Sequence, residues 1–168
     1  EKIWYKLRRR NSIHMIDLSN VKKVHFVGIG GIGISSIARM MVLKRAGVSG
    51  SDASDSEIVQ ELRKLNCEVA IGQKEKNIKP DLDLVIYSIA VPEDNPELVK
   101  ARKLRIKTLS YPEALGLISK NHYTIAIAGT HGKTTTTAMV AKIFIDAGLK
   151  PTAIVGSLLK DTKSNFVA

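Results

Sequence analysis

The chain has 168 residues, 44% of them apolar, with 26 lysines and arginines, 16 aspartates and glutamates and a single cysteine. This composition is typical of a globular protein of one or two domains, and it excludes a disordered or disulfide-stapled chain. A lone cysteine cannot form an internal disulfide, and no apolar run approaches the roughly 18 residues of a membrane span, so we expect a reducing, cytoplasmic setting without a membrane partner.

The net charge of +10 is uneven along the chain. Residues 1–23 hold a balance of +5, residues 24–120 hold +2 and residues 121–168 hold +3. A nucleic-acid-binding module that uses Arg8 to Arg10 is one interpretation, but aromatic residues for base stacking make up only 5% of the chain. We interpret residues 1–21 as a basic leader or added arm and expect no nucleic-acid partner.

Short β-branched runs alternate with longer amphipathic segments from Lys22 onward, which predicts βαβ units and a parallel sheet. Strands are predicted at residues 24–29, 47–50, 67–71, 84–87 and 106–109, and helices at residues 33–45, 55–65, 95–104 and 111–119. The pattern restarts near residue 120, with a strand at 122–128, a helix at 134–147 and a strand at 151–155. The fold class is therefore α/β, with a Rossmann-like domain over residues 22–120 and the start of a second α/β domain over 121–168.

A glycine-rich loop, GIGGIG at residues 28–33, follows the first predicted strand and opens the first predicted helix. Gly28 permits a tight turn, Gly30 allows a diphosphate to approach the backbone, and Gly33 allows close helix packing. Asp52 ends the second strand, where an acidic residue commonly binds a ribose hydroxyl. This arrangement predicts a nucleotide site, and a turn that serves only packing is the alternative.

A second loop, AGTHGKTTTT at residues 128–137, also lies between a predicted strand and a predicted helix. It is similar to a P-loop, in which backbone N–H groups hold phosphates, a lysine reaches the β and γ groups and a hydroxyl binds magnesium. Lys133 and Thr134 would take the last two roles. Gly129 lies three positions before Gly132, which indicates a shorter variant of the usual loop.

Some chemically reactive residue types have simpler interpretations. Cys67 begins a predicted buried strand and is expected to pack rather than react. His25 is expected to be structural, and Asp81 with Asp83 to form a turn. For Glu93 to Asn95, between two prolines, we expect a turn and helix cap, with a ligand contact as the alternative.

Four segments in order resemble the front part of a Mur ligase: residues 24–38, 48–52, 87–98 and 128–139. The resemblance covers the chain from about Lys22, and the G-T-H-G-K-T-T loop is its most specific element. It implies that the first domain holds a UDP-sugar rather than NAD. The implied UDP-sugar-binding set includes Gly28 in the turn, and Gly30, Gly31, Ile32 and Gly33, whose N–H groups would face the diphosphate. It also includes Ser51 and Asp52 toward uridine, and Ser88 and Ala90 along the same crevice.

The same resemblance implies that ATP binds at Gly129, Thr130, His131, Gly132, Lys133, Thr134 and Thr135, with Lys133 and Thr134 catalytic and Thr134 a Mg²⁺ ligand. It implies UDP-N-acetylmuramate and L-alanine as substrates, joined as an amide through an acyl phosphate. Such ligases have three domains, and we expect this chain to be the front part of one, unable to ligate alone.

Three alternatives remain open at this point. A nicotinamide-dependent oxidoreductase would explain GIGGIG and Asp52 but leaves the second loop unexplained. A nucleic-acid-binding module would use the basic leader. Another member of the Mur ligase family, with a different sugar-peptide or amino acid, is the nearest rival, and the sequence leaves the oligomeric state open.

Overall fold

A computed structural model describes residues 18, 20–120, 122–159 and 164–167 of the chain. The basic leader predicted at residues 1–21 therefore lies almost wholly outside the described residues, and the Arg8 to Arg10 run lies wholly outside them. Within the described residues, no helix is long and apolar enough to cross a membrane.

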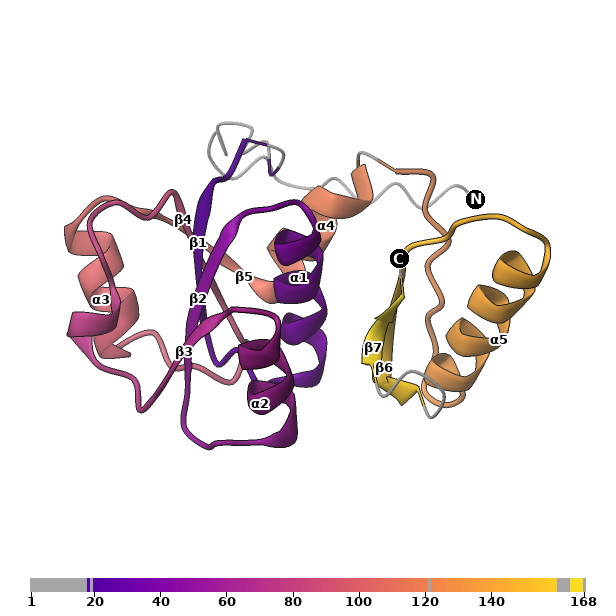
Figure 1. Cartoon of the computed structure of the whole chain (residues 1–168), viewed down its shortest axis with the longest axis horizontal. Helices are drawn as coiled ribbons and strands as arrows, with labels where there is room; N and C mark the ends of the chain where they lie inside the picture. Colours follow the sequence, from indigo (N-terminus) through magenta and orange to yellow (C-terminus); the bar gives the residue numbers. More distant parts are fainter. Residues whose placement is uncertain (1–17, 19, 121, 160–163, 168) are drawn as a thin grey trace, which may run out of the picture.

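Five parallel strands form one sheet in the order β3-β2-β1-β4-β5, which confirms the predicted Rossmann-like arrangement (Figure 1). The strands are β1 Lys23–Val27, β2 Gly47–Asp52, β3 Glu68–Ile71, β4 Leu84–Tyr87 and β5 Lys107–Ser110. The helices are α1 Ile32–Leu43, α2 Glu57–Lys64, α3 Pro96–Lys103 and α4 Tyr111–Lys120, with a short 3-10 turn, η1, at Glu75–Asn77. Each element lies within a few residues of its predicted position.

Alternate residues of each strand face opposite sides of the sheet, so the two faces carry different cores. One face packs against α1, α2 and α4 through residues such as Phe26, Ile37 and Leu62. The other face packs against α3 through a smaller set that includes Val27, Val85 and Leu98. In Figure 1, α3 lies on one side of the sheet and α1 with α2 on the other.

The strand order reverses between β1 and β4, which lie side by side at the centre of the sheet. β2 and β3 continue on one side of β1, and β5 continues on the far side of β4. In open parallel sheets, such a reversal leaves a crevice at the carboxyl ends of the strands, where ligands bind. The GIGGIG loop follows β1 and therefore lies at this position.

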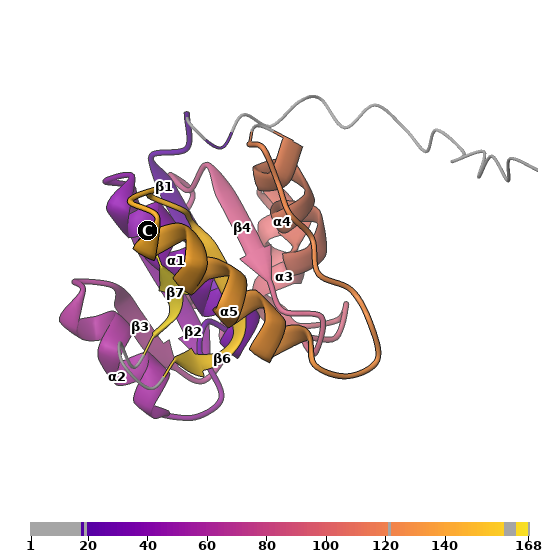
Figure 2. The same cartoon turned by 90° about the vertical axis from the view of Figure 1, so that its right-hand side faces the viewer.

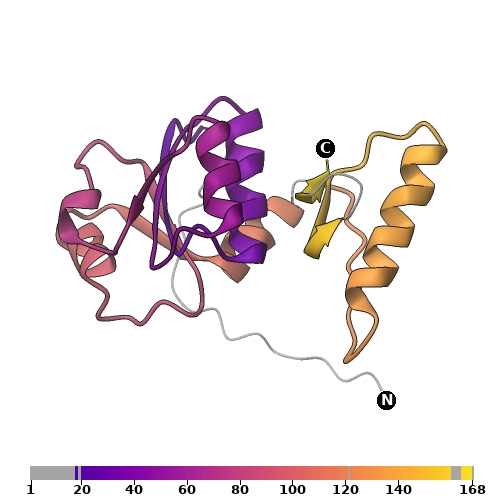
Figure 3. The ribbon, with the colours of Figure 1, turned by 60° about the horizontal axis from the view of Figure 1, so that its bottom comes forward.

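The last part of the chain forms α5 (Lys133–Asp146) and an antiparallel pair, β6 (Ala153–Leu159) with β7 (Ser164–Val167). The hairpin lies between α5 and α1, as Figures 1 and 3 both show. Figure 2 views the same arrangement with α5 in front of the hairpin. Phe166 and Ile154 join the hydrophobic core that surrounds α1.

Two expectations for this second part were wrong. Residues 122–128 were predicted to be a strand, but they form none, and Tyr123 is 99% exposed. A strand requires a neighbour that pairs with its backbone groups, and none of the described strands pairs with this segment. The strand expected at residues 151–155 begins at Ala153, extends to Leu159 and pairs antiparallel with β7 instead of entering a parallel sheet.

Candidate nucleotide-binding site

The GIGGIG loop turns sharply where β1 ends and α1 begins. Gly28 has φ +78°, a conformation that side chains with a Cβ rarely adopt. The N–H groups of Gly28 and Ile29 donate to the Ser51 carbonyl at 2.8 and 3.0 Å, so the end of β2 supports the loop. This support fixes the position at which α1 starts.

The backbone N–H groups of the loop divide into two sets. Gly30 donates to the Asp52 carboxylate at 2.8 Å, and Gly31 donates to the Gly28 carbonyl at 3.2 Å. Ile32, Gly33 and Ile34 form the first turn of α1, and their N–H groups have no acceptor among the described residues. The N-terminus of α1 thus presents unpaired donors and a positive dipole end, which suit an anionic group.

Polar side chains surround the loop at close range, as the space beside each glycine shows. A Cβ built on Gly28 would lie 3.1 Å from the Ser88 Cβ, and one on Gly31 would lie 4.0 Å from the Ser88 hydroxyl. A Cβ on Gly30 would lie 2.9 Å from Asp52 Oδ2 and 3.0 Å from the Ser56 hydroxyl. The structure therefore brings together the loop, Asp52 and Ser88, as the sequence predicts, and adds Ser56, the N-cap of α2.

Two other predicted residues take less direct positions. The Ser51 side chain is fully buried, and its hydroxyl donates to Glu97 on the α3 side of the sheet, so Ser51 reaches the loop only through its carbonyl. Ala90 is exposed after β4, and its N–H donates to the Ser88 hydroxyl at 3.4 Å. Ala90 thereby holds Ser88 toward the loop.

A buried polar cluster surrounds Glu97 on the α3 side of the sheet, and the sequence did not predict it. The Glu97 carboxylate accepts hydrogen bonds from the Ser51 hydroxyl at 2.6 Å, the Asn77 amide at 2.5 Å and the Lys74 N–H at 3.1 Å. His25 Nε2 lies 3.3 Å from the same carboxylate. Burial alone would raise the pKa of Glu97, but the hydrogen bonds from His25, Ser51 and Asn77 lower it below its ordinary value.

His25 and Asn95, which the sequence predicts to have structural roles, lie in or next to this cluster. His25 is buried, as expected, and its other ring nitrogen contacts the Ser49 hydroxyl at 2.9 Å. Asn95 caps α3 by accepting from the Glu97 N–H at 2.9 Å, which confirms the predicted cap. The expected cap at Asn95 lies two residues before Glu97, but only the fold shows that Glu97 reaches His25, 72 residues away.

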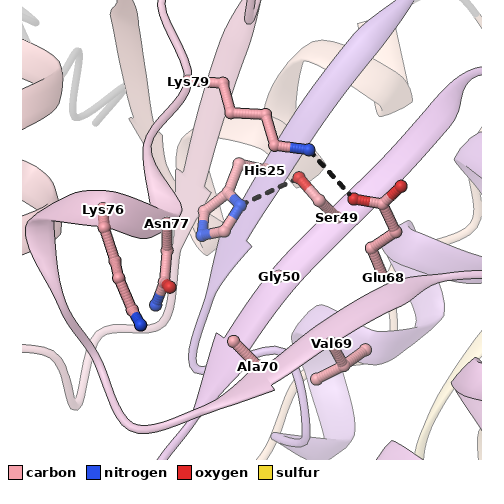
Figure 4. A pocket seen from close by; sticks show the side chains of 9 residues that line it. All are labelled: His25, Ser49, Gly50, Glu68, Val69, Ala70, Lys76, Asn77 and Lys79. Carbon is pink, nitrogen blue, oxygen red and sulfur yellow. Dashed lines mark hydrogen bonds and ion pairs between the residues drawn. The ribbon is translucent and has the colours of Figure 1, made fainter.

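A shallow hollow of about 400 Å³ opens on the α3 side of the sheet, above His25, Ser49 and Gly50 (Figure 4). It exists because a short 3-10 turn, rather than a full helix, links β3 to β4. Its rim carries Lys79, which pairs with Glu68 at 3.1 Å. The charges of this pair offset each other, and Lys76 also lines the hollow.

The second glycine loop starts α5. Gly132 is the N-cap, with φ +77°, and the N–H groups of the first turn of α5 have no acceptor among the described residues. Lys133 Nζ folds back on the loop and donates to the carbonyls of Gly129 at 2.6 Å and Thr130 at 3.0 Å. Thr134 lies beside β6, since a Cβ on Gly156 would lie 3.1 Å from its hydroxyl. Free amides, a lysine and a hydroxyl at one helix end suit the phosphates of a nucleotide.

This loop would supply few metal ligands itself. No group of three or more His, Cys, Asp or Glu residues that could hold a metal occurs in the described part of the chain. Mg²⁺ bound to nucleotides takes most of its ligands from phosphates and water, and it needs few protein groups. The Thr134 hydroxyl at the start of α5 fits that requirement.

Known proteins share this combination of loop and sheet. The Mur ligase family, catalytic domain, matches residues 23–123. The chain belongs to the Mur ligase family. This match does not support the nicotinamide-dependent oxidoreductase that the first loop alone allowed.

Curated Mur ligases match most of the chain. A UDP-N-acetylmuramate–L-alanine ligase of Clostridium tetani is 48% identical over 149 residues, which are 88% of this chain and 32% of that relative. A ligase with the same description from Pelobacter propionicus is 46% identical over 145 residues, 86% of this chain and 31% of that relative. The chain thus spans about a third of the length of these relatives.

Two solved Mur ligase structures have the same arrangement. The UDP-N-acetylmuramate-alanine ligase of Thermotoga maritima matches with a TM-score of 0.81 and 36% identity, over 86% of this chain and 34% of that one. The UDP-N-acetylmuramate:L-alanyl-gamma-D-glutamyl-meso-diaminopimelate ligase of Neisseria meningitides matches with a TM-score of 0.79 and 26% identity, over 87% and 46%. Each match covers more of the chain than the five-stranded sheet, whose last strand ends at Ser110. Both likenesses therefore include residues outside the sheet.

Proposed function

We propose that this chain forms the UDP-sugar-binding part, and the ATP-binding loop, of an ATP-dependent UDP-N-acetylmuramate–L-alanine ligase of peptidoglycan synthesis. The observation that carries the proposal is the N-terminus of α1, where three unpaired N–H groups face the crevice between β1 and β4. The relatives that share 46–48% identity with the chain carry this name. We place the reaction in the cytoplasm, where ATP is available.

At the first site, the diphosphate of UDP-N-acetylmuramate would bind the N–H groups of Ile32 and Gly33 at the positive end of α1. Asp52, beside Gly30, would accept a hydrogen bond from a uridine ribose hydroxyl. Ser88, which Ala90 holds against the loop, would donate along the same crevice. Each of these groups comes from the carboxyl end of a strand in one sheet, and they are therefore held rigidly with respect to one another.

At the second site, ATP would occupy residues 129–135, and Lys133 would exchange its loop carbonyls for phosphate oxygens. Lys133 would then offset the negative charge that builds on the transferring phosphoryl group. Thr134 and the phosphates would hold Mg²⁺, which would supply further charge neutralisation. In the reaction proposed, the sugar carboxylate takes the γ-phosphoryl group, and the amine of L-alanine displaces phosphate to form the amide.

The experiment that tests two separate sites is Lys133→Ala in this chain, studied by titration calorimetry. We expect the affinity for ATP·Mg²⁺ to fall about tenfold or more, since a charge-assisted contact to phosphate is lost. The affinity for UDP-N-acetylmuramate should remain within about twofold, because the lysine belongs to another loop. A parallel loss of both affinities would contradict the proposed division, and unchanged ATP affinity would remove Lys133 from the site.

A further inference from the structure

Tyr111 lies against the glycine loop, at a position to which the sequence assigned no role. It is the first residue of α4 and follows β5 directly, so it stands at the carboxyl edge of the sheet, where ligands of this fold bind. A Cβ built on Gly33 would lie 2.7 Å from Tyr111 Cζ and 2.9 Å from its hydroxyl oxygen. The phenol therefore touches the first turn of α1, which carries the unpaired N–H groups.

Glu113 holds the backbone just before Tyr111. The Glu113 carboxylate accepts from the Ser110 N–H at 2.8 Å and from the Ser110 hydroxyl at 2.7 Å. Pro112 occupies the first turn of α4, where a missing N–H costs nothing. Tyr111 is thereby fixed at its backbone, and its ring is packed against the core that surrounds α1.

The Tyr111 hydroxyl has no hydrogen-bond partner within the described part of the chain. The hydroxyl oxygen is not among the fully buried polar atoms without a partner, so it is open to solvent or to a ligand. Packing against Gly33 explains the ring but does not explain the hydroxyl, since phenylalanine would fill the same space. Partial burial also raises the pKa of Tyr111, so the phenol remains protonated and able to donate at neutral pH.

We propose that the Tyr111 hydroxyl donates a hydrogen bond to the diphosphate of a nucleoside-diphosphate sugar bound at the GIGGIG loop, an inference that rests on the function proposed above. The hydroxyl and the N–H groups of Ile32 and Gly33 lie at the same end of α1. A phosphate oxygen that accepts from those N–H groups has further lone pairs free for a neighbouring hydroxyl. Tyr111 would thus complete the donor set at the side of the loop that faces α4.

The test is Tyr111→Phe, which removes the hydroxyl and keeps the ring on Gly33. Calorimetry would measure binding of UDP-N-acetylmuramate, UDP, uridine and ATP·Mg²⁺, with Tyr123→Phe as the control because Tyr123 is 99% exposed. We expect Tyr111→Phe to weaken UDP-N-acetylmuramate and UDP by about three- to tenfold, the usual effect of one neutral hydrogen bond. Uridine lacks a diphosphate, and ATP·Mg²⁺ binds the other loop. The affinities of both variants for these two ligands should therefore equal those of the parent chain.

Each other outcome has a distinct meaning. If the parent chain binds UDP-N-acetylmuramate and Tyr111→Phe binds it equally well, the inference is wrong while the proposed function stands. An equal loss for uridine and UDP would place the hydroxyl on the nucleoside and overturn the diphosphate contact. If the parent chain binds neither UDP nor UDP-N-acetylmuramate, the proposed function itself fails. Equal melting temperatures of the parent and the variant would show that lost folding does not cause the change.

Discussion

Glu97 is the residue on which the support of the candidate site depends most. It comes from the first turn of α3, is fully buried, and connects β1, β2 and the η1 segment through His25, Ser51 and Asn77. Removal of such an acceptor leaves several buried donors without a partner. We expect Glu97→Ala to lower the free energy of unfolding by about 2–4 kcal/mol, and Glu97→Gln, which keeps one acceptor oxygen, by less. Urea unfolding would measure both changes. A loss below about 0.5 kcal/mol for Glu97→Ala would contradict the supporting role of Glu97.

The acid limit of stability should depend on the same carboxylate. The pKa of folded Glu97 lies below its ordinary value, so the group stabilises the fold above the unfolded pKa of about 4.3, and this contribution is lost as the pH falls through the folded pKa. We expect Glu97→Gln to flatten the decline in melting temperature below about pH 4.3. Glu93, which is exposed, provides the control as Glu93→Gln. An unchanged pH profile in Glu97→Gln would show that other groups set the acid limit.

Cys67 should be chemically inert in the folded chain. It is 5% exposed, and burial raises the pKa of its thiol to about 11, with Arg39 lowering it slightly. Since the thiolate is the reactive form, a thiol reagent at pH 7.5 should modify the native chain much more slowly than the urea-unfolded chain. Reaction of the native chain at the unfolded rate would contradict its burial and reopen a reactive role.

At the scale of elements, the close approach of β1 and β2 requires glycine at position 50 of β2 but not at position 47. A Cβ on Gly50 would lie 2.8 Å from the Phe26 carbonyl oxygen and 2.6 Å from Ile29 Cδ1, whereas a Cβ on Gly47 would meet nothing nearer than 3.6 Å. We expect Gly50→Ala to lower the unfolding free energy by about 1–3 kcal/mol and Gly47→Ala to change it by less than about 0.5. Equal effects of the two substitutions would contradict this register of β1 and β2.

The sheet and its helices could be predicted from the sequence because their signals are local. Apolar runs, helix caps at Ser56 and Asn95, and the glycine loop all act within a few residues of one another. The segment at 122–128 could not, because a β-branched run becomes a strand only beside a neighbour, and no described strand pairs with it. Glu97 and Tyr111 were missed for a related reason. Their partners lie on elements far away in sequence, so only the assembled fold brings them together.

At the scale of the whole molecule, the β6–β7 hairpin joins the part of the chain with the second loop to α1. The Asn165 side-chain amide donates to the Ile32 carbonyl and to the Ser35 hydroxyl, the latter at 3.0 Å. Phe166, 8% exposed, lies in the core that surrounds α1. The hairpin therefore contacts both α1, which carries the first loop at its start, and α5, which follows the second.

This contact predicts that the hairpin can be loosened without unfolding the sheet. Phe166→Ala removes most of a buried aromatic side chain, so hydrogen exchange in residues 153–157 should become at least about tenfold faster. Exchange in β1 and β4 should stay as slow as in the parent chain. Faster exchange throughout the five-stranded sheet would show that the hairpin is part of one cooperative unit with it. Unchanged exchange everywhere would show that Phe166 does not hold the hairpin.

The account rests most heavily on the first glycine loop being a site for a UDP-sugar. Titration calorimetry of this chain with UDP-N-acetylmuramate, and separately with NADH, tests this most directly. We predict saturable binding of UDP-N-acetylmuramate with one molecule per chain, competed by UDP, and at least about tenfold weaker binding of NADH, a gap of about 1.4 kcal/mol. Binding of NADH that equals or exceeds that of UDP-N-acetylmuramate, with no competition by UDP, would contradict the central claim.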